Sequence, residues 1–386
     1  MHYIRFLKTP KVTAAAGKIT LNASITLTTD LGETFYDGDV DLAGTLRSPD
    51  RDGDIYLRRS LKWTAGMRSL PITFDLTRSE IEWPAQLHVS LKTPRGELAD
   101  DFETFSGQPD HDTPAFISVW SESLNATRGN FEAARRVERR FTPLSGRSLR
   151  IWEDTGDSIA RHLWDGSVAL TAFIDRVIAL QASAAVPPLE HALVSATFKR
   201  LNVIELGCGC GIVGIGLAQS IPDSDVLLTD LPEVQELVEK NISTANLAIS
   251  SRVEFAPLDW ESKLPKAVAS RNFDIIVAAE CIYNSDSIPP LVQTIKALVT
   301  RSPKAIVLIA TKFRHDSELE FFTLAAKAGL FSSTKSTLPL PGPPGYGYAD
   351  FSKEVALHIL VGPNYRASFS PAFESDKALE LSSGSE

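Results

Sequence analysis

The stretch Val203-Ile-Glu-Leu-Gly207-Cys-Gly209-Cys-Gly211-Ile-Val-Gly214 decides the fold of this chain. It places a glycine-rich loop directly after a short apolar strand and directly before a helix. Glycines at alternate positions let the backbone turn sharply and approach a ligand closely, and the helix start adds N–H donors. Asp230 lies 19 residues after Gly211, at the end of the next apolar strand, where an acidic residue can bind ribose hydroxyls. The loop therefore predicts a nucleoside or nucleotide site.

Around this loop, the second half of the chain alternates strands with helices. Strands are expected at 201–206, 225–229, 253–257, 273–279, 305–311, 331–338 and 355–361, and helices at 212–220, 232–241, 290–300 and 317–328. Such alternation predicts right-handed crossovers and a mainly parallel sheet. Because no helix separates the last two strands, we expect them to pair as an antiparallel hairpin. The fold class is therefore α/β, with a Rossmann-like seven-stranded sheet that ends in this hairpin.

The first part of the chain has the period of β-strands. Apolar residues alternate with polar ones in 18–28, and further short candidates are 39–46, 54–63, 70–76, 86–92 and 115–120. Turn-rich segments at 48–53 and 107–114 separate some of them. Short strands at this spacing predict a mostly-β, sandwich-like N-terminal domain.

The segment between the two parts is expected to be helical. Residues 130–141 are charged and helix-prone, and Glu132 and Arg136 stand four apart, which favours a solvated, salt-bridged helix face over a nucleic-acid surface. Residues 157–180 carry an apolar stripe that would face a core. The expected domains are 1–125 (β-rich), 126–185 (helical connector) and 186–365 (α/β), with a disordered tail at 366–386.

Composition excludes several classes of protein. The chain has 386 residues, of which 43% are hydrophobic and 23% charged, so disordered, collagen-like and coiled-coil proteins are excluded. Its net charge of −9 makes it a poor generic nucleic-acid binder. No apolar run approaches the ~18–20 residues that cross a bilayer, and the N-terminus lacks the apolar core of a signal peptide. Three cysteines are too few for a disulfide framework. We expect a cytoplasmic or nuclear protein with no membrane or nucleic-acid partner; the sequence leaves its oligomeric state open.

Other interpretations of the glycine loop stay open at this point. The glycines at 209, 211 and 214 also fit a dinucleotide fingerprint, although the terminal hairpin argues against it. A purely structural turn would carry an unnecessary entropic cost in glycines. Cys208 and Cys210 do not have zinc spacing and lack a nearby partner pair, so no metal is expected.

The residues resemble a known family, the eukaryotic seven-β-strand protein-lysine methyltransferases. The segments that carry the resemblance are Glu205–Gly214, Thr229-Asp-Leu-Pro232, Ala279-Glu-Cys-Ile-Tyr-Asn284, and the tryptophan segment Ser158-Ile-Ala-Arg-His-Leu-Trp-Asp-Gly166. It covers roughly residues 150–362 and leaves the N-terminal part without a counterpart. The resemblance implies a class I methyltransferase fold, the cofactor S-adenosylmethionine and a protein substrate.

The resemblance also implies roles for individual residues. Gly207, Gly209 and Gly211 would line the methionine and ribose part of the cofactor, next to Glu205, and Asp230 would take the ribose hydroxyls. Asp259 and Trp260 match the adenine position, and Trp164 would lie at the methionine end. Glu280 and Tyr283 match the family's Asp-x-x-Tyr motif at the methyl-transfer channel, with glutamate in place of the usual aspartate.

The chemistry of methyl transfer suggests what these residues would do. We expect Glu280 to orient the acceptor amine and Tyr283 to form an aromatic wall, with Tyr346 and Tyr348 helping to close the channel. Plainer roles remain open: Trp164 as a core anchor, Glu280 as a cap, and the two later tyrosines as turn residues. The function favoured is methylation of a protein lysine. The alternatives are methylation of a small-molecule amine or other acceptor, and a non-catalytic adaptor with a vestigial cofactor site.

Overall fold

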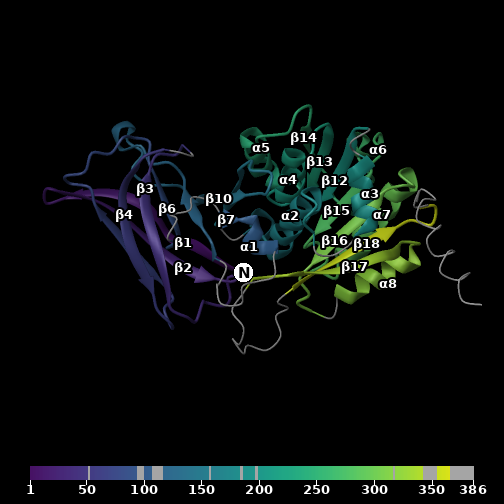
Figure 1. The fold of residues 1–386 in the computed structure, drawn as a ribbon, viewed down its shortest axis with the longest axis horizontal. Helices are drawn as coiled ribbons and strands as arrows, with labels where there is room; N and C mark the ends of the chain where they lie inside the picture. The colour runs from purple at the N-terminus through teal and green to yellow at the C-terminus, as the bar shows by residue number, and fades with distance from the viewer. Residues whose placement is uncertain are drawn as a thin grey trace, which may run out of the picture.

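The structure is a computed structural model, and it describes residues 1–50, 53–93, 100–106, 116–155, 158–182, 186–195, 199–315, 318–341 and 354–365. These residues form a β-rich N-terminal unit and an α/β C-terminal unit, which lie side by side in Figure 1. The N-terminus lies at the junction of the two units. Within the described ranges, every helix is too short or too polar to cross a membrane.

The C-terminal unit is built on a seven-stranded sheet in the order β14-β13-β12-β15-β16-β18-β17. The first five strands in this order are parallel, and β18 pairs antiparallel with both β16 and β17. This arrangement confirms the predicted sheet and its terminal hairpin. The strands are β12 (Leu201–Leu206), β13 (Ser224–Asp230), β14 (Arg252–Pro257), β15 (Ile275–Ala279), β16 (Ile306–Thr311), β17 (Phe331–Pro339) and β18 (Glu354–Val361).

Helices cover both faces of this sheet. One face packs against α2 (Asp165–Ile178), α3 (Pro187–Ser195), α4 (Ile212–Ser220) and α5 (Gln235–Thr244), and the other against α6 (Lys266–Ala269), α7 (Ile288–Arg301) and α8 (Leu319–Lys327). Along β12, Val203 faces the first core and Ile204 the second, because successive side chains of a strand point to opposite faces. Because helices cover both faces of the sheet, side chains on both sides of each strand are buried, and these strands are almost continuously apolar.

The sheet has a switch point at β12. The chain runs from β12 to β13 and β14 on one side and then returns to β15 and β16 on the other. In open α/β sheets, ligands bind outside the carboxyl ends of the strands at such a point. The glycine loop that follows β12 therefore lies where this architecture makes a crevice.

The N-terminal unit has two sheets with an apolar core between them, as the alternation predicted. The four-stranded sheet has the order β5-β2-β1-β8: β1 (His2–Ala15), β2 (Lys18–Thr28), β5 (Leu70–Asp75) and β8 (Phe116–Ile117). The larger sheet has the order β11-β10-β9-β6-β3-β4, with β7 beside β10: β3 (Val40–Arg47), β4 (Ile55–Trp63), β6 (Gln86–Leu91), β7 (Asp100–Asp101), β9 (Val119–Ser121), β10 (Arg136–Thr142) and β11 (Leu149–Asp154).

Short helical elements complete the chain. They are α1 (Phe102–Ser106) and the 3₁₀ turns η1 (Ala126–Arg128), η2 (Ile159–Arg161) and η3 (Pro232–Val234). The strand β1 and the helices α1 and α3 were not predicted from the sequence. In β1 the register shifts between Phe6 and Lys8 and again before Lys11, and these irregularities break the strict alternation that a sequence pattern relies on.

The helix expected over 130–141 is wrong, because β10 occupies the second half of this range. Glu132 pairs with Lys11 instead of Arg136, and Arg136 pairs with Asp154 on the neighbouring strand β11. Glu138 and Arg139 are fully buried on the two sides of β10. Charged residues are usually exposed, so a buried charged strand looks like a solvated helix in sequence. The expected helical connector therefore contains two strands before the helix α2.

The two units share a continuous apolar core. Phe141, Leu149 and Ile151 of the N-terminal unit join the same cluster as Leu170 and Ile174 of α2. The apolar stripe predicted for α2 is therefore buried partly against the N-terminal unit.

We place the boundary between the two units after β11. The tail at 366–386 lies outside the described residues.

Candidate functional site

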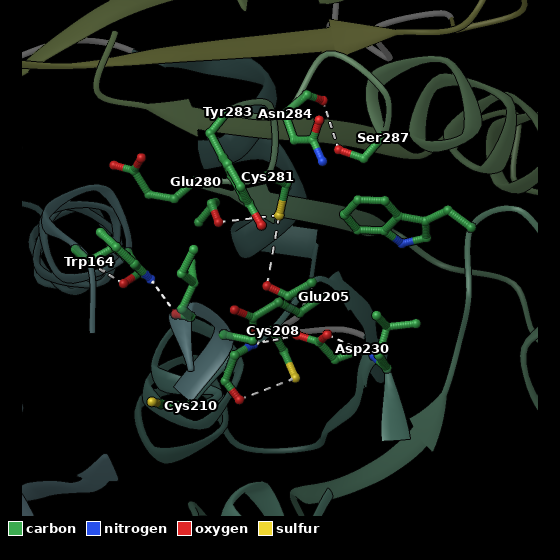
Figure 2. A pocket seen from close by; sticks show the side chains of 18 of the residues that line it. Trp164, Glu205, Cys208, Cys210, Asp230, Glu280, Cys281, Tyr283, Asn284 and Ser287 are labelled. Atoms are coloured by element: carbon green, nitrogen blue, oxygen red, sulfur yellow. Dashed lines mark hydrogen bonds between the residues drawn. The ribbon is translucent and has the colours of Figure 1, made fainter. Parts of the chain in front are cut away.

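A cavity of about 310 Å³ opens at the carboxyl ends of β12, β13 and β15. It falls within the range of roughly 300–1,000 Å³ that is usual for small-molecule sites. Figure 2 shows the side chains that surround it, which come from the glycine loop, the Trp164 segment and the loops after β13, β14 and β15. The fold thus brings together segments that are far apart in the chain.

The glycine loop is fixed to the neighbouring strand by Asp230. The Gly209 amide donates to Oδ2 of Asp230 at 2.8 Å, and the Leu231 amide donates to Oδ1 at 2.7 Å. Burial raises the pKa of Asp230, while these two amides oppose the shift. Each carboxylate oxygen accepts one backbone amide, which leaves further lone pairs for hydroxyl donors.

Gly207 shows why this loop needs glycine. Its φ is +60°, in the left-handed region. A Cβ there would lie 2.7 Å from the Cys281 sulfur and 3.2 Å from the Trp260 ring. The backbone therefore passes so close to the cavity wall that a side chain has no room.

Glu205 lies beneath the loop. Its Oε2 accepts a 2.8 Å hydrogen bond from the Gly214 amide in the first turn of α4. Burial raises the pKa of Glu205 to about 8, and the nearby Asp230 charge adds to this. Glu205 lines the cavity and also holds the loop to the helix that follows it.

The Trp164 segment forms a second wall. Trp164 immediately precedes α2, and its Nε1 donates to the Ile159 carbonyl at 3.1 Å. Ile159, Ala160 and His162 of the same segment also line the cavity. In the sequence, the only sign that Ile159, Ala160 and His162 belong to the site is that they lie in the same segment as Trp164. Trp164 is partly exposed, so it serves the cavity wall rather than acting only as a core anchor.

Asp259 and Trp260 line the cavity on the side of β14, as predicted. Asp259 accepts hydrogen bonds from the Glu261 amide at 2.9 Å and from the Ser262 hydroxyl at 3.2 Å. The Nε1 atom of Trp260 is buried and has no hydrogen-bond partner among the described residues. A buried indole N–H usually finds a partner, so this donor is available to a ligand.

Glu280 and Tyr283 lie at the lip of the cavity and point in different directions (Figure 2). The Glu280 carboxylate accepts from the Gly166 amide at 2.9 Å and from Arg314 at 2.7 Å. Burial raises the pKa of Glu280 to about 7, and the Arg314 charge opposes this. Tyr283 is 57% exposed. Glu280 thus caps the start of α2, while the Tyr283 ring remains open to a ligand.

The three cysteines are free, buried and close to the cavity. Burial raises the pKa of each thiol well above its ordinary value. The Cys281 sulfur lies 3.2 Å from the Leu206 carbonyl oxygen. In the part of the chain that the structure describes, no group of three or more His, Cys, Asp or Glu side chains is placed to hold a metal ion.

Most of the predicted site residues line this one cavity: Trp164, Glu205, Gly207, Gly209, Asp230, Asp259, Trp260, Glu280 and Tyr283. Gly211 is not among the lining residues; it is the N-cap residue of α4, with a φ of +77°, and a Cβ there would lie 2.8 Å from the Leu228 side chain. Tyr346 and Tyr348 lie outside the described residues. The sequence analysis did not identify Arg314 as a residue of the site, although Arg314 follows β16 at the same edge of the sheet. It did not identify Asp30 either, and nothing in the sequence around Asp30 marks it as functional.

The residues present fit the cofactor that the resemblance implies. Among its described residues the cavity lining contains no Lys or Arg and six acidic side chains, which are Glu205, Asp230, Glu233, Asp259, Glu261 and Glu280. Because burial raises the pKa of Glu205 to about 8, the negative charge at neutral pH comes from the other members of this set. Such a lining favours a cation, and S-adenosylmethionine carries a sulfonium. Asp230 would hold the ribose hydroxyls, Trp260 would offer its free N–H, and the glycine loop would admit the methionine part at close range.

Comparisons with known proteins agree with this geometry. A family model described as lysine methyltransferase matches residues 144–328. EEF1A lysine methyltransferase 3 of Xenopus tropicalis is 28% identical over 209 residues, which cover 53% of this chain and 81% of the relative. A UPF0665 family protein of Schizosaccharomyces pombe is 26% identical over 326 residues, which cover 83% of this chain and 92% of the relative. The latter match is long enough to include part of the N-terminal unit.

Solved structures of methyltransferases were also found. Magnesium protoporphyrin IX methyltransferase from Synechocystis, with bound S-adenosylmethionine, is 12% identical with a TM-score of 0.33, covering 54% of this chain and 86% of that chain. The family match coincides with the cavity-bearing unit and the glycine loop. Residues 144–328 of this chain are thus similar to the lysine methyltransferase family, and two relatives over longer stretches include one named as a lysine methyltransferase.

Proposed function

We propose that this protein transfers a methyl group from S-adenosylmethionine to the side-chain amine of a lysine in a protein substrate. The observation that carries the proposal is the bond between the Gly209 amide and Asp230, at the mouth of a cavity lined by carboxylates. This bond holds the Asp230 carboxylate against the glycine loop at the switch point of the sheet, which supports a role for Asp230 in binding ribose hydroxyls. The match of residues 144–328 to the lysine methyltransferase family model supports the amine acceptor.

When bound, S-adenosylmethionine supplies an activated methyl group together with its own leaving group. The protein therefore has to position the reactants and exclude water. Asp230 and Trp260 would hold the nucleoside, and Trp164 would cover the methionine end. The loops after β12 and β15 would then leave the cavity lip free for the acceptor.

The acceptor amine must lose its proton before it can attack. The carboxylates Glu233, Asp259 and Glu261 around the cavity would attract a lysine ammonium, and burial inside it lowers the pKa of an amine. The exposed ring of Tyr283 can then contact the cationic methyl-bearing group, an interaction worth ~0.5–2 kcal/mol. The contacts of Glu280 with Gly166 and Arg314 favour a role in fixing the lip over direct contact with the amine.

The partner and the compartment follow from similar arguments. Relatives named EEF1A lysine methyltransferase 3 and calmodulin-lysine N-methyltransferase support a protein substrate for this chain, whose identity the comparisons leave open. We propose that the protein works in the cytosol or nucleus, without a nucleic-acid partner. The three free thiols and the net charge of −9 support this.

Binding and transfer can be tested separately. Calorimetry with S-adenosylhomocysteine should show binding to the wild type and at least tenfold weaker binding to Asp230→Ala. Incubation of the protein with a labelled methyl donor and a cell extract should then place label on a protein band that yields methyllysine on hydrolysis. Label only in the small-molecule fraction would indicate a different acceptor, and a wild type that binds no S-adenosylhomocysteine would indicate an adaptor with a vestigial site.

A further inference from the structure

A single guanidinium joins the N-terminal unit to the lip of the cavity. Asp30 follows β2, and its almost fully buried Oδ2 lies 2.5 Å from Nη2 of Arg314. The Nη1 of the same Arg314 lies 2.7 Å from Oε2 of Glu280. Arg314 itself follows β16, so three segments from the two units meet at this one side chain.

The conformation of Glu280 depends on these contacts. Its φ is +58°, in the left-handed region that non-glycine residues rarely adopt. Such strain persists only where the surroundings over-determine it. Here Oε1 of Glu280 accepts from the Gly166 amide at 2.9 Å and the Lys312 amide at 3.3 Å, and Oε2 accepts from Arg314. Glu280 is thereby held to the start of α2 and to the end of β16.

The charges around this junction are buried and paired. Lys312 Nζ lies 2.9 Å from Asp165 and 3.7 Å from Asp30, and the Met1 amine lies 2.9 Å from Asp165. The groups that face Glu280 are therefore Arg314, Lys312, Asp30 and Asp165, with the amine beyond Asp165. Removing one member of such a buried set leaves its partner uncompensated. Loss of the Asp30 charge would deprive Arg314 of one of its two carboxylates.

We infer that Asp30 is a positioning residue of the methyl-transfer site, acting through Arg314 to hold Glu280 and the cavity lip in place. Asp30 does not line the cavity, whereas Glu280 does. The N-terminal unit is then part of the active site and not an appended module. The expected consequence is a loss in the transfer step with little change in cofactor affinity. The expected loss of methyl transfer rests on the proposed function, whereas the role of Asp30 in holding Glu280 in place does not.

The test uses Asp30→Asn in the full chain, with Glu122→Gln as the matched control. Glu122 also forms an ion pair between the units, 2.9 Å from Lys240, but neither residue lines the cavity. Hydrogen exchange at the Lys312 amide is the decisive measurement, because this amide bonds to Glu280, whereas Lys312 meets Asp30 only through Nζ, at 3.7 Å. The Arg314→Lys variant leaves that Lys312–Asp30 contact in place and so separates it from the path through Arg314. We expect exchange at Lys312 and Gly166 to be at least tenfold faster in Asp30→Asn and unchanged in Glu122→Gln.

Kinetics give a second, independent readout. With labelled donor, Asp30→Asn should lower kcat at least tenfold while the Kd for S-adenosylhomocysteine stays within twofold of wild type. In an Arg314→Gln background, Asp30→Asn should cause no further loss of kcat, since the path through Arg314 is already broken. Arg314→Lys provides a second variant that keeps the charge but not the two-pronged geometry, and it should accelerate Lys312 exchange in the same way.

Three results would overturn the inference. Unchanged exchange at Lys312 in both Asp30→Asn and Arg314→Lys would show that Glu280 does not depend on this contact. Fully additive losses of kcat in the double variant would show that Asp30 acts independently of Arg314. Equal acceleration in Glu122→Gln would show a general loosening of the two units. A wild type that transfers no methyl group would count against the proposed function alone, because the exchange measurement still decides the role of Asp30.

Discussion

The Leu163 amide donates a 2.8 Å hydrogen bond to Oε2 of Glu153, so a fully buried carboxylate of the N-terminal unit holds the segment that carries Trp164. The other oxygen of Glu153 lies 2.7 Å from the buried Arg139. Burial alone would raise the pKa of Glu153, but the Arg139 charge outweighs it and the pKa lies well below its usual range. The cavity wall that carries Trp164 therefore depends on the Glu153–Arg139 ion pair. Arg139 of this pair lies outside residues 144–328, which the family model matches.

Glu153→Gln should destabilise the protein strongly. The substitution leaves the Arg139 guanidinium without its charged partner in a site with no solvent exposure, which costs about 3–5 kcal/mol. Denaturant unfolding of the variant measures this loss directly. The double variant Glu153→Gln, Arg139→Gln should recover part of it; if the double variant is less stable than the single one, the ion pair is not the cause.

Glu205→Gln should remove a pH-dependent penalty on stability. In the folded protein the pKa of Glu205 is raised to about 8, whereas in the unfolded chain it is about 4.3. Between these values the folded state holds a proton that the unfolded state has lost, so wild-type stability falls as pH rises through this window and levels off above it. Glutamine keeps an acceptor for the Gly214 amide and has no such titration.

The free energy of unfolding of Glu205→Gln, relative to that of wild type, should therefore increase from pH 5 to pH 8. Denaturant titration without cofactor measures this difference. Glu239→Gln, on the exposed face of α5, is the control and should show a pH-independent difference from wild type. An equally constant difference for Glu205→Gln would mean that Glu205 is ionised in the folded state.

Gly209→Ala should weaken cofactor binding at least tenfold. Gly209 has a φ of +53°, and a Cβ there would lie 2.9 Å from the Ala160 carbonyl oxygen, so the Trp164 segment would have to move. Gly329→Ala is the matched control, because it also has a positive φ, of +84°, but meets nothing within 4 Å. Calorimetry with S-adenosylhomocysteine compares the two. Equal affinities would show that the approach of the segment to the loop is not required for binding.

Tyr283→Ala should lower kcat/KM for methyl transfer about 2- to 30-fold, the range that corresponds to a cation–π contact of ~0.5–2 kcal/mol. Because the side chain is largely exposed, the free energy of unfolding should change little. Tyr283→Phe retains the ring and should keep most of the activity. A Phe variant as impaired as the Ala variant would assign the effect to the hydroxyl group instead.

The sequence by itself determined the α/β unit and most of its cavity. Local patterns were sufficient for β12 and α4, because a short apolar strand, alternating glycines and a following helix are all properties of adjacent residues. The register of parallel strands then brings the ends of β12 and β13 together, so Asp230 could be placed opposite the loop from spacing alone.

Only the tertiary structure decided what the N-terminal unit contributes. The strand β10 carries the buried charge of Arg139, whose partner Glu153 is on β11, so the pattern of β10 resembled a solvated helix until that partner was known. Likewise, Asp30 reaches Arg314 across 284 positions of the chain. Long-range ion pairs leave no periodic signal in sequence, because their energy depends on burial and geometry that the fold alone creates.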